Sequence, residues 1–560
     1  MFVVQSSSRL ASHIRICRCR QVELSSSIEF VAVENLLSLE ITVVELLLLV
    51  SVVAMLAQRI RVPYTVVLVL VGLLLSFQQE LQFSLTPELI LLLILPPLVF
   101  EAALHIEITT LRGIIVPVLL LAIPGVLLVM FIVGGILSLS GLVGWRTALL
   151  FGSLIAATDP VAVVSLFKAL GAPKRLATLV ESESLFNDGT TIVVFHIVVA
   201  VLFMTGSEQG GTGNLFDVMV YGVFQFLRVA LGGVGIGVAV GIIGNRIFAL
   251  LDDHLIETTL STVIAYGIYV FAESFHLSGV LAVVSAGILI GARSSGSMSP
   301  TTRTVLMNFW EYVAFLANSI VFILIGMEVV FDRLVAASLP ILVAVVAVLL
   351  ARAMSVYALS FLSNRIGERV PISYQHILFW GGLRGAVSLA LALSLGFDIP
   401  HRDVIINMTF GVVLFTLLVQ ATTINGLLAR LGLAGRHKAE LEYERIQGRL
   451  LAVRAAYQRL RQQYDSGILD PLAWNIVKNE LEARMSALQQ ELDDFAAANP
   501  EILAKIIHSA QREALRTQRA AIMDLHRDGL LSESVAHQLF AEIDQALESP
   551  AAPEAGLTSA

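Results

Sequence analysis

Two short motifs place carboxylates inside apolar segments of this chain. Asp159 follows Thr158 in the run AATDP, and Asp188 ends the run ESESLFND. Both runs lie in segments long and apolar enough to cross a bilayer. A carboxylate within hydrocarbon is costly unless it is paired, hydrated or protonated, so such residues typically mark ion or proton pathways. We therefore expect these two aspartates to bind a cation, a proton or both.

Pro160 predicts a break in the first of these two helices. Because proline has no N–H, the carbonyl of Ala156 loses its helical partner. A freed carbonyl beside Asp159 is a potential ligand for an alkali cation, as in the broken helices of transporters.

The second helix presents polar groups on two neighbouring faces, because residues four apart share a face. Ser184 and Asp188 lie on one face. Glu183 and Asn187 lie on the next. One helix thus offers a hydroxyl, an amide and two carboxylates to Asp159.

Buried carboxylates of this kind can exchange protons for cations. Burial and a nearby negative charge each raise the pKa of a carboxyl group, which brings proton release toward physiological pH. Once deprotonated, the group is a ligand for Na⁺. If only loaded states cross the membrane, this competition yields obligatory exchange without ATP or a cofactor. Asp188 is the first choice for the alternating carboxylate and Asp159 the second.

Three motifs occur in order along the chain: AATDPVAVV (156–164), ESESLFNDGTT (181–191) and GGLRGAVSLALAL (381–393). Together they resemble the monovalent cation:proton antiporter-1 family, the Na⁺/H⁺ exchanger type, and the similarity covers about residues 43–435. The resemblance implies inverted repeats, crossed broken helices and a homodimer.

The resemblance also implies roles for individual residues. The implied ion- and proton-binding residues are Asp159, Asp188, Ser184, Thr158 and Glu101. The first four of these would hold Na⁺. Glu183 and Arg384 match a pair that braces the core and holds Asn187 in place. Two alternatives remain open. In the first, Arg384 is the counter-ion for an empty Asp188. In the second, which is independent of the first, Glu101 is a carboxylate at a span end that faces water.

The activity implied by the resemblance is secondary antiport of Na⁺ and Li⁺ against H⁺. Electrogenic relatives typically have Asp at the position of Asn187, so the chain resembles the electroneutral branch. K⁺/H⁺ antiport is an alternative, because selectivity depends on cavity size and ligand rigidity. A sodium-coupled solute symporter is an alternative of another class, although the spans lack an additional polar cluster for an organic substrate.

The amino-acid composition indicates which class of protein these residues belong to. Of the 560 residues, 56% are hydrophobic and 14% charged, and the mean hydropathy is +0.83. These values exclude a soluble multidomain enzyme. A net charge of −8 without clustered Lys and Arg argues against a nucleic-acid partner. The only cysteines, Cys17 and Cys19, are too few for a zinc site. The sequence therefore predicts an all-α polytopic membrane protein.

About thirteen apolar segments have the length that a bilayer demands. Transmembrane helices are predicted at 41–58, 63–77, 87–104, 113–139, 146–169, 177–204, 218–249, 258–274, 278–292, 304–330, 338–362, 373–396 and 404–429. Most basic residues of the loops between the spans lie on one side of the membrane: Arg59, Arg61, Arg112, Lys174, Arg175, Arg246, Arg293, Arg303, Arg365, Arg369, Arg436 and Lys438. The other side has only Arg146, Arg333 and Arg402. This asymmetry predicts a cytoplasmic C-terminus, and the short loops favour a bacterial plasma membrane.

The composition changes after residue 433. Residues 434–548 are charged and helically periodic, which predicts a cytoplasmic domain with helices near 437–464, 471–495, 501–527 and 532–547. This domain packs on itself or on its copy in a dimer, or it acts as a regulatory sensor. Residues 1–30 and 549–560 are expected to be disordered, which leaves 31–433 as the transmembrane antiporter domain.

Overall fold

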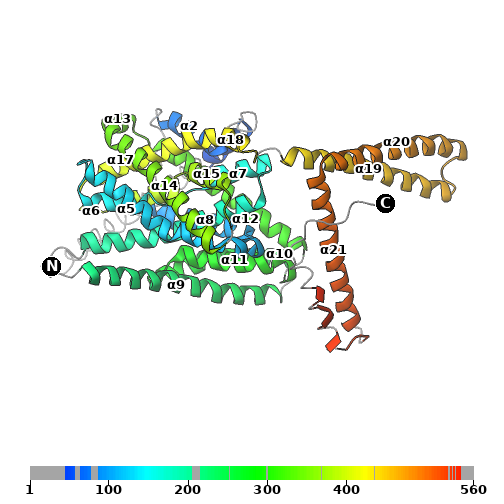
Figure 1. Cartoon of the computed structure of the whole chain (residues 1–560), viewed down its shortest axis with the longest axis horizontal. Coiled ribbons are helices and arrows are strands. Elements are labelled where there is room, and N and C mark those ends of the chain that lie inside the picture. The colour runs from blue at the N-terminus through cyan, green and yellow to red at the C-terminus, as the bar shows by residue number, and fades with distance from the viewer. Residues whose placement is uncertain are drawn as a thin grey trace, which may run out of the picture. The chain divides into compact units, whose positions relative to one another are not determined.

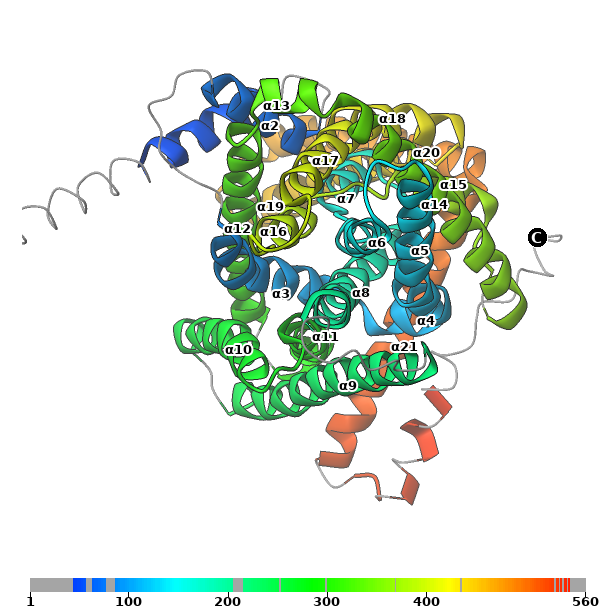
Figure 2. The ribbon, with the colours of Figure 1, turned by 90° about the vertical axis from the view of Figure 1, so that its left-hand side faces the viewer.

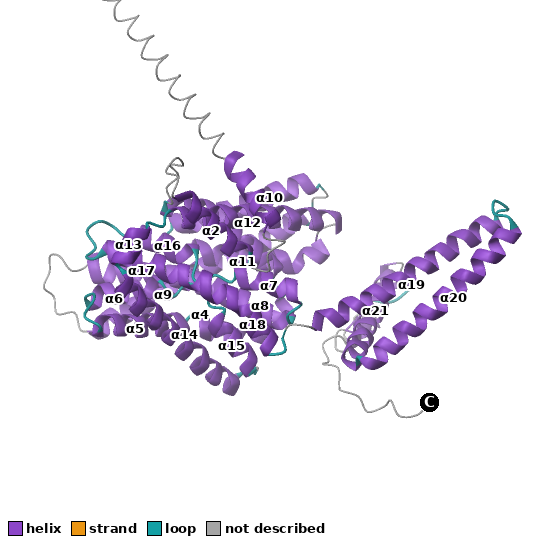
Figure 3. Cartoon of the chain, turned by 90° about the horizontal axis from the view of Figure 1, so that it is seen from above, coloured by secondary structure: helices purple, strands orange, loops and turns teal. Residues whose placement is uncertain are grey.

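The computed structural model describes residues 44–56, 63–76, 86–204, 215–250, 253–297, 300–367, 369–433 and 436–527, with short stretches between 530 and 543. Regular structure in these ranges is helical throughout (Figures 1 and 3). Contacts between Cα atoms divide the chain into two units, Met1–Leu433 and Ala434–Ala560. The segments 1–30 and 549–560, for which disorder is expected, lie outside the described residues.

Within the described residues, seven helices of the first unit are long and apolar enough to cross a membrane. They are α4 with α5 (Ile108–Ala122, Pro124–Leu139), α8 (Lys174–Val199), α9 (Leu215–Phe248), α10 (His254–Ser274), α12 (Pro300–Met327), α14 (Ser338–Ile366), and α17 with η3 and α18 (Arg402–Phe415, Thr416–Gln420, Ala421–Arg430). A π-helical turn, η2 (Ala200–Met204), extends α8, and the short α13 (Phe331–Ala336) precedes α14.

Shorter apolar helices account for four more of the predicted spans. They are Val44–Leu56, α2 (Tyr64–Ser76), η1 with α3 (Leu89–Ile94, Leu95–His105) and α11 (Gly279–Ser297). The last two predicted spans are each interrupted and form α6 with α7 (Trp145–Leu154, Val161–Leu170) and α15 with α16 (Ile372–Trp380, Ala386–Leu393). Each predicted span therefore has a helical counterpart.

The outer helices of this unit present apolar side chains to their surroundings. On α9, Val223, Phe224 and Leu231 are 59%, 66% and 64% exposed. Figure 2 shows α9 and α10 on the rim of the bundle and α6 and α8 in its interior. An apolar surface of this kind is unfavourable in water and suited to lipid. The protein is an integral membrane protein.

Small residues set the position of α3. Gly287 and Gly291 of α11 face Ala103 and Leu104 of α3, and a Cβ at either glycine would overlap with α3. Close packing of this kind is a common way to join membrane helices. It brings α3 beside α8, with which both α3 and α11 are in contact.

The second unit is built on a helical hairpin of α19 (Arg436–Asp465) and α20 (Pro471–Ala498). Its core includes Ile446 and Leu492, and Trp474 stacks on Tyr464. Gly467 adopts a positive φ of 72° in the turn, as expected for a glycine at a helix end. A third helix, α21 (Pro500–Arg527), follows. These helices lie close to three of the four predicted ranges, and half of the fourth, 532–547, falls outside the described residues.

Candidate functional site

The predicted break at Pro160 is present. Helix α6 ends at Leu154, and α7 begins only at Val161. Proline cannot continue the hydrogen-bond ladder of a helix because it has no N–H. The carboxylate of Asp159 accepts a 3.0 Å hydrogen bond from the N–H of Val161. Asp159 therefore satisfies an N–H group at the N-terminus of α7, where a negative charge is favourable.

A second break separates α15 from α16 at residues 381–385, within the motif GGLRG. The two breaks are in direct contact, because the N–H of Asp159 donates a 2.9 Å hydrogen bond to the carbonyl of Leu383. A Cβ at Gly385 would overlap with the carboxylate of Asp159. The four half-helices thus meet at the motif residues, which is the crossed arrangement implied by the family resemblance.

The contact at Gly385 gives a first prediction. We expect Gly385→Ala to destabilise the protein by about 1–3 kcal/mol, because the added methyl group must displace Asp159 or the backbone of the break. The thermal unfolding midpoint of the purified protein measures this change. Gly135→Ala in α5 is the matched control, since a Cβ there meets nothing within 4 Å. Equal midpoints for the two variants would contradict the close approach at Gly385.

Two buried arginines cap the C-terminal ends of the broken helices. Arg384 donates hydrogen bonds of 2.7 Å from Nη1 to the carbonyls of Ala156 and Ala157, just after α6. Arg352 of α14 donates to the carbonyl of Leu378 near the end of α15, at 3.3 Å from Nε and 3.1 Å from Nη2. Positive charge is favourable at these carbonyl ends. The carbonyl of Ala156, predicted as a cation ligand, is thus bonded to Arg384.

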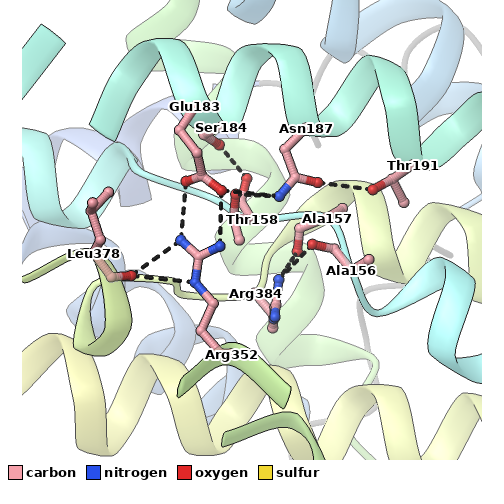
Figure 4. A network of polar contacts seen from close by, with 10 residues as sticks. All are labelled: Ala156, Ala157, Thr158, Glu183, Ser184, Asn187, Thr191, Arg352, Leu378 and Arg384. Carbon is pink, nitrogen blue, oxygen red and sulfur yellow. Dashed lines mark hydrogen bonds and ion pairs between the residues drawn. The ribbon is translucent and has the colours of Figure 1, made fainter. Parts of the chain in front are cut away.

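The ion pair of Glu183 differs from the predicted one. Arg352, and not Arg384, forms a bidentate pair with Glu183, with N–O distances of 2.8 Å and 3.0 Å (Figure 4). Both side chains are buried, so each charge requires the other. In the described part of the chain Arg384 forms no ion pair with a carboxylate. The expected pair was implied by the family resemblance alone, and the sequence does not reveal which of the two arginines faces α8.

Hydrogen bonds from α8 hold the first break in place. The amide of Asn187 donates to the carboxylate of Glu183 and to the hydroxyl of Thr158, both at 3.3 Å. It also accepts a 2.9 Å hydrogen bond from the hydroxyl of Thr191. The hydroxyl of Ser184 donates to the carbonyl of Thr158 (Figure 4). Because Ser184 donates its proton, its oxygen keeps lone pairs that can face a cation.

Asp159 and Asp188 line the same cavity, which has a volume of about 90 Å³. Thr158 and Ser184 line it as well. Oδ1 of Asp188 is buried and has no hydrogen-bond partner among the described residues. The space holds a few water molecules at about 30 Å³ each. Two carboxylates facing such a space can share a proton or a cation.

Glu101 is not brought into this cavity. Leu98 and Ala102 of the same helix line it, whereas Glu101 does not. The carboxylate of Glu101 lies 3.2 Å from Nδ1 of His105, one turn further along α3, and its side chain is 19% exposed. The implied contribution of Glu101 to the ion site is therefore not seen in this structure.

Four polar residues of the site are absent from the predicted set. Arg352 has a recognisable signal, since a charge in the middle of an apolar span must find an anion or carbonyls. Glu181 of α8 lines the cavity and has the same signal, because it is a charge within an apolar span. Ser388 of α16 and Asn318 of α12 also line the cavity. These two have no such signal, because uncharged polar residues are common in membrane helices.

Interrupted helices that cross beside buried carboxylates define a class of secondary ion transporters. Comparison with known protein families agrees with this class. The family model described as sodium/hydrogen exchanger, transmembrane, matches residues 46–430. The chain belongs to this family, whose members are transporters rather than enzymes.

Individual relatives show the same likeness. The chain is 36% identical over 481 residues to the low-affinity Na⁺/H⁺ antiporter NhaS1 of Synechocystis. This alignment covers 85% of this chain and 90% of the relative. It is 42% identical over 406 residues to the Na⁺/H⁺ antiporter ApNhaP of Aphanothece halophytica, covering 71% and 75%. The sodium proton antiporter MjNhaP1 of Methanocaldococcus jannaschii shares the fold, with a TM-score of 0.58 at 22% identity over 69% of this chain and 96% of that chain.

Proposed function

We propose that the protein is a secondary antiporter that exchanges Na⁺, and also Li⁺, for H⁺. The observation that carries this proposal is that Asp159 and Asp188 line one small cavity. A cation and a proton need the same carboxylate oxygens, so binding of one expels the other. Relatives that are named Na⁺/H⁺ antiporters support this reading.

Each residue of the cavity has a role in the proposed cycle. Asp188 alternates between proton and cation, because its Oδ1 has no other partner among the described residues. Asp159 is the second carboxylate, with one oxygen committed to the N–H of Val161. Ser184 and Thr158 supply uncharged oxygens. The cavity opens to one side of the membrane and then to the other, and only a loaded site crosses.

We propose that the exchange is electroneutral. Asn187 stands beside the ion-binding carboxylates and carries no charge, and its amide is committed to Glu183 and Thr191. Glu183 is neutralised by Arg352. Replacement of one proton by one monovalent cation then leaves the charge of the site unchanged.

The cavity also bears on the alternatives. Sites for organic molecules usually exceed about 300 Å³, so a cavity of about 90 Å³ disfavours a sodium-coupled solute symporter. K⁺/H⁺ exchange requires the same carboxylates and stays the second candidate. We further propose a homodimer in a bacterial plasma membrane, with the unit Ala434–Ala560 on the cytoplasmic side.

Inside-out vesicles with an imposed pH gradient provide the test. We expect Na⁺ and Li⁺ to collapse the gradient, and choline chloride to have no effect. The permeant anion thiocyanate, which dissipates a membrane potential, should leave the rate unchanged if the exchange is electroneutral. A response to K⁺ alone would replace the proposed cation, and no response to any of the three cations would refute antiport.

A further inference from the structure

Ser388 brings an oxygen of the second broken span to the cavity. It lies in the first turn of α16 and lines the cavity together with Asp159 and Asp188. Its side chain is 0% exposed. Its hydroxyl has no hydrogen-bond partner among the described residues. A buried polar group without a partner is uncommon and calls for a physical explanation.

The break explains why the backbone does not satisfy this hydroxyl. A serine in a membrane helix usually donates to the carbonyl three or four residues before it, as Ser394 does to Leu391 at 2.9 Å. For Ser388 these positions are Gly385 and Arg384. The carbonyl of Arg384 lies before the N-cap Gly385, outside the helix, and the carbonyl of Gly385 already accepts the N–H of Leu389 at 3.4 Å.

The oxygens of the predicted site come from the first broken span and α8, whereas Asn318 of α12 and Ser388 of α16 line the cavity from the second half of the chain. Thr158, Asp159, Ser184 and Asp188 belong to the first broken span and to α8. Alkali cations prefer hard oxygen ligands. A hydroxyl from α16 adds such a ligand from the second broken span, and a bound cation would then link the two crossed breaks.

We propose that the hydroxyl of Ser388 contacts the transported cation and contributes to the selectivity of the site. This inference rests on the proposed antiport. It assigns to α16 a direct part in cation binding, beyond the packing of its break against Asp159.

Two variants of Ser388 separate a ligand from a space-filling residue. Ser388→Ala removes the oxygen, and Ser388→Cys keeps the side-chain size but replaces the hard oxygen with sulfur. We expect both to raise the apparent KM for Na⁺ and Li⁺ about three- to tenfold, the loss typical of one uncharged polar contact. The maximal rate should change less, because both carboxylates remain. The KM ratio of Na⁺ to Li⁺ should also shift.

Ser182→Ala is the matched control in the same vesicles. Ser182 is also 0% exposed, and its hydroxyl likewise has no partner among the described residues, but it does not line the cavity. Its KM should stay at the wild-type value. A wild-type KM in Ser388→Cys with a raised KM in Ser388→Ala would assign a space-filling role and overturn the inference.

The failure of this inference is distinguishable from failure of the proposed function. Active wild-type protein with unchanged KM in both Ser388 variants would overturn only the role of Ser388. Wild-type protein that responds to no cation would overturn antiport and the inference with it. A Na⁺-induced rise in the thermal unfolding midpoint, measured against choline chloride, gives a second readout. The rise should be smaller in both Ser388 variants, and an undiminished rise would contradict cation contact.

Discussion

Replacing Asp188 by Asn is expected to abolish cation-dependent proton exchange. The variant keeps the shape of the side chain but removes the negative charge and the site of protonation. Loss of a charged ligand costs up to about 3 kcal/mol, or about a hundredfold in cation affinity. Because the neutral amide also cannot carry the proton, the coupled reaction should fall below detection in the vesicle assay.

The structure allows this variant to fold. Oδ1 of Asp188 makes no hydrogen bond to the described residues, so an amide in its place breaks no bond at that atom. Asp403→Asn is the control, since the side chain of Asp403 is 92% exposed at the start of α17. It should exchange cations at the wild-type rate. Full exchange in Asp188→Asn, with correct insertion in the membrane, would remove Asp188 from the site.

Replacing Arg352 by Ala is expected to cause the largest loss of stability. The variant leaves the carboxylate of Glu183 buried without its bidentate partner. Removing one member of a buried ion pair typically costs 3–5 kcal/mol, about the cost expected here. The carbonyl of Leu378 also loses its donor. The thermal unfolding midpoint in detergent measures the effect.

A comparison with Arg384→Ala tests the assignment of the pair. Arg384 donates to the carbonyls of Ala156 and Ala157 and has no carboxylate partner among the described residues. The double variant Glu183→Gln with Arg352→Gln removes both charges of the pair. It should be more stable than Arg352→Ala, whereas the same Glu183→Gln change should not rescue Arg384→Ala. Rescue of Arg384→Ala but not of Arg352→Ala would indicate that Glu183 pairs with Arg384 instead of Arg352.

The fold could be predicted from the sequence to a large extent, because the bilayer imposes a length on each apolar segment. Pro160 indicates the first break, since proline leaves few alternatives in a helix. The second break contains no proline. A second interrupted helix is implied only by the family resemblance, and the structure places its break between α15 and α16.

The site was predictable where its residues share one helix. Spacing along α8 places Ser184 and Asp188 on one face and Glu183 and Asn187 on the next; the first two line the cavity, and the second two are hydrogen-bonded to each other. Contacts between distant spans were not predictable in this way. The pairing of Glu183 with Arg352 depends on how α14 faces α8, and the periodicity of a single helix does not contain this information.

Proton release on cation binding tests the central claim most directly. Purified protein in weakly buffered detergent solution is titrated with NaCl, with choline chloride as the control, and a pH indicator records the protons released. Competition for the oxygens of Asp159 and Asp188 predicts proton release that saturates with Na⁺ and is absent in Asp188→Asn. Saturable Na⁺ binding without proton release would contradict the claim that the two ions share one site.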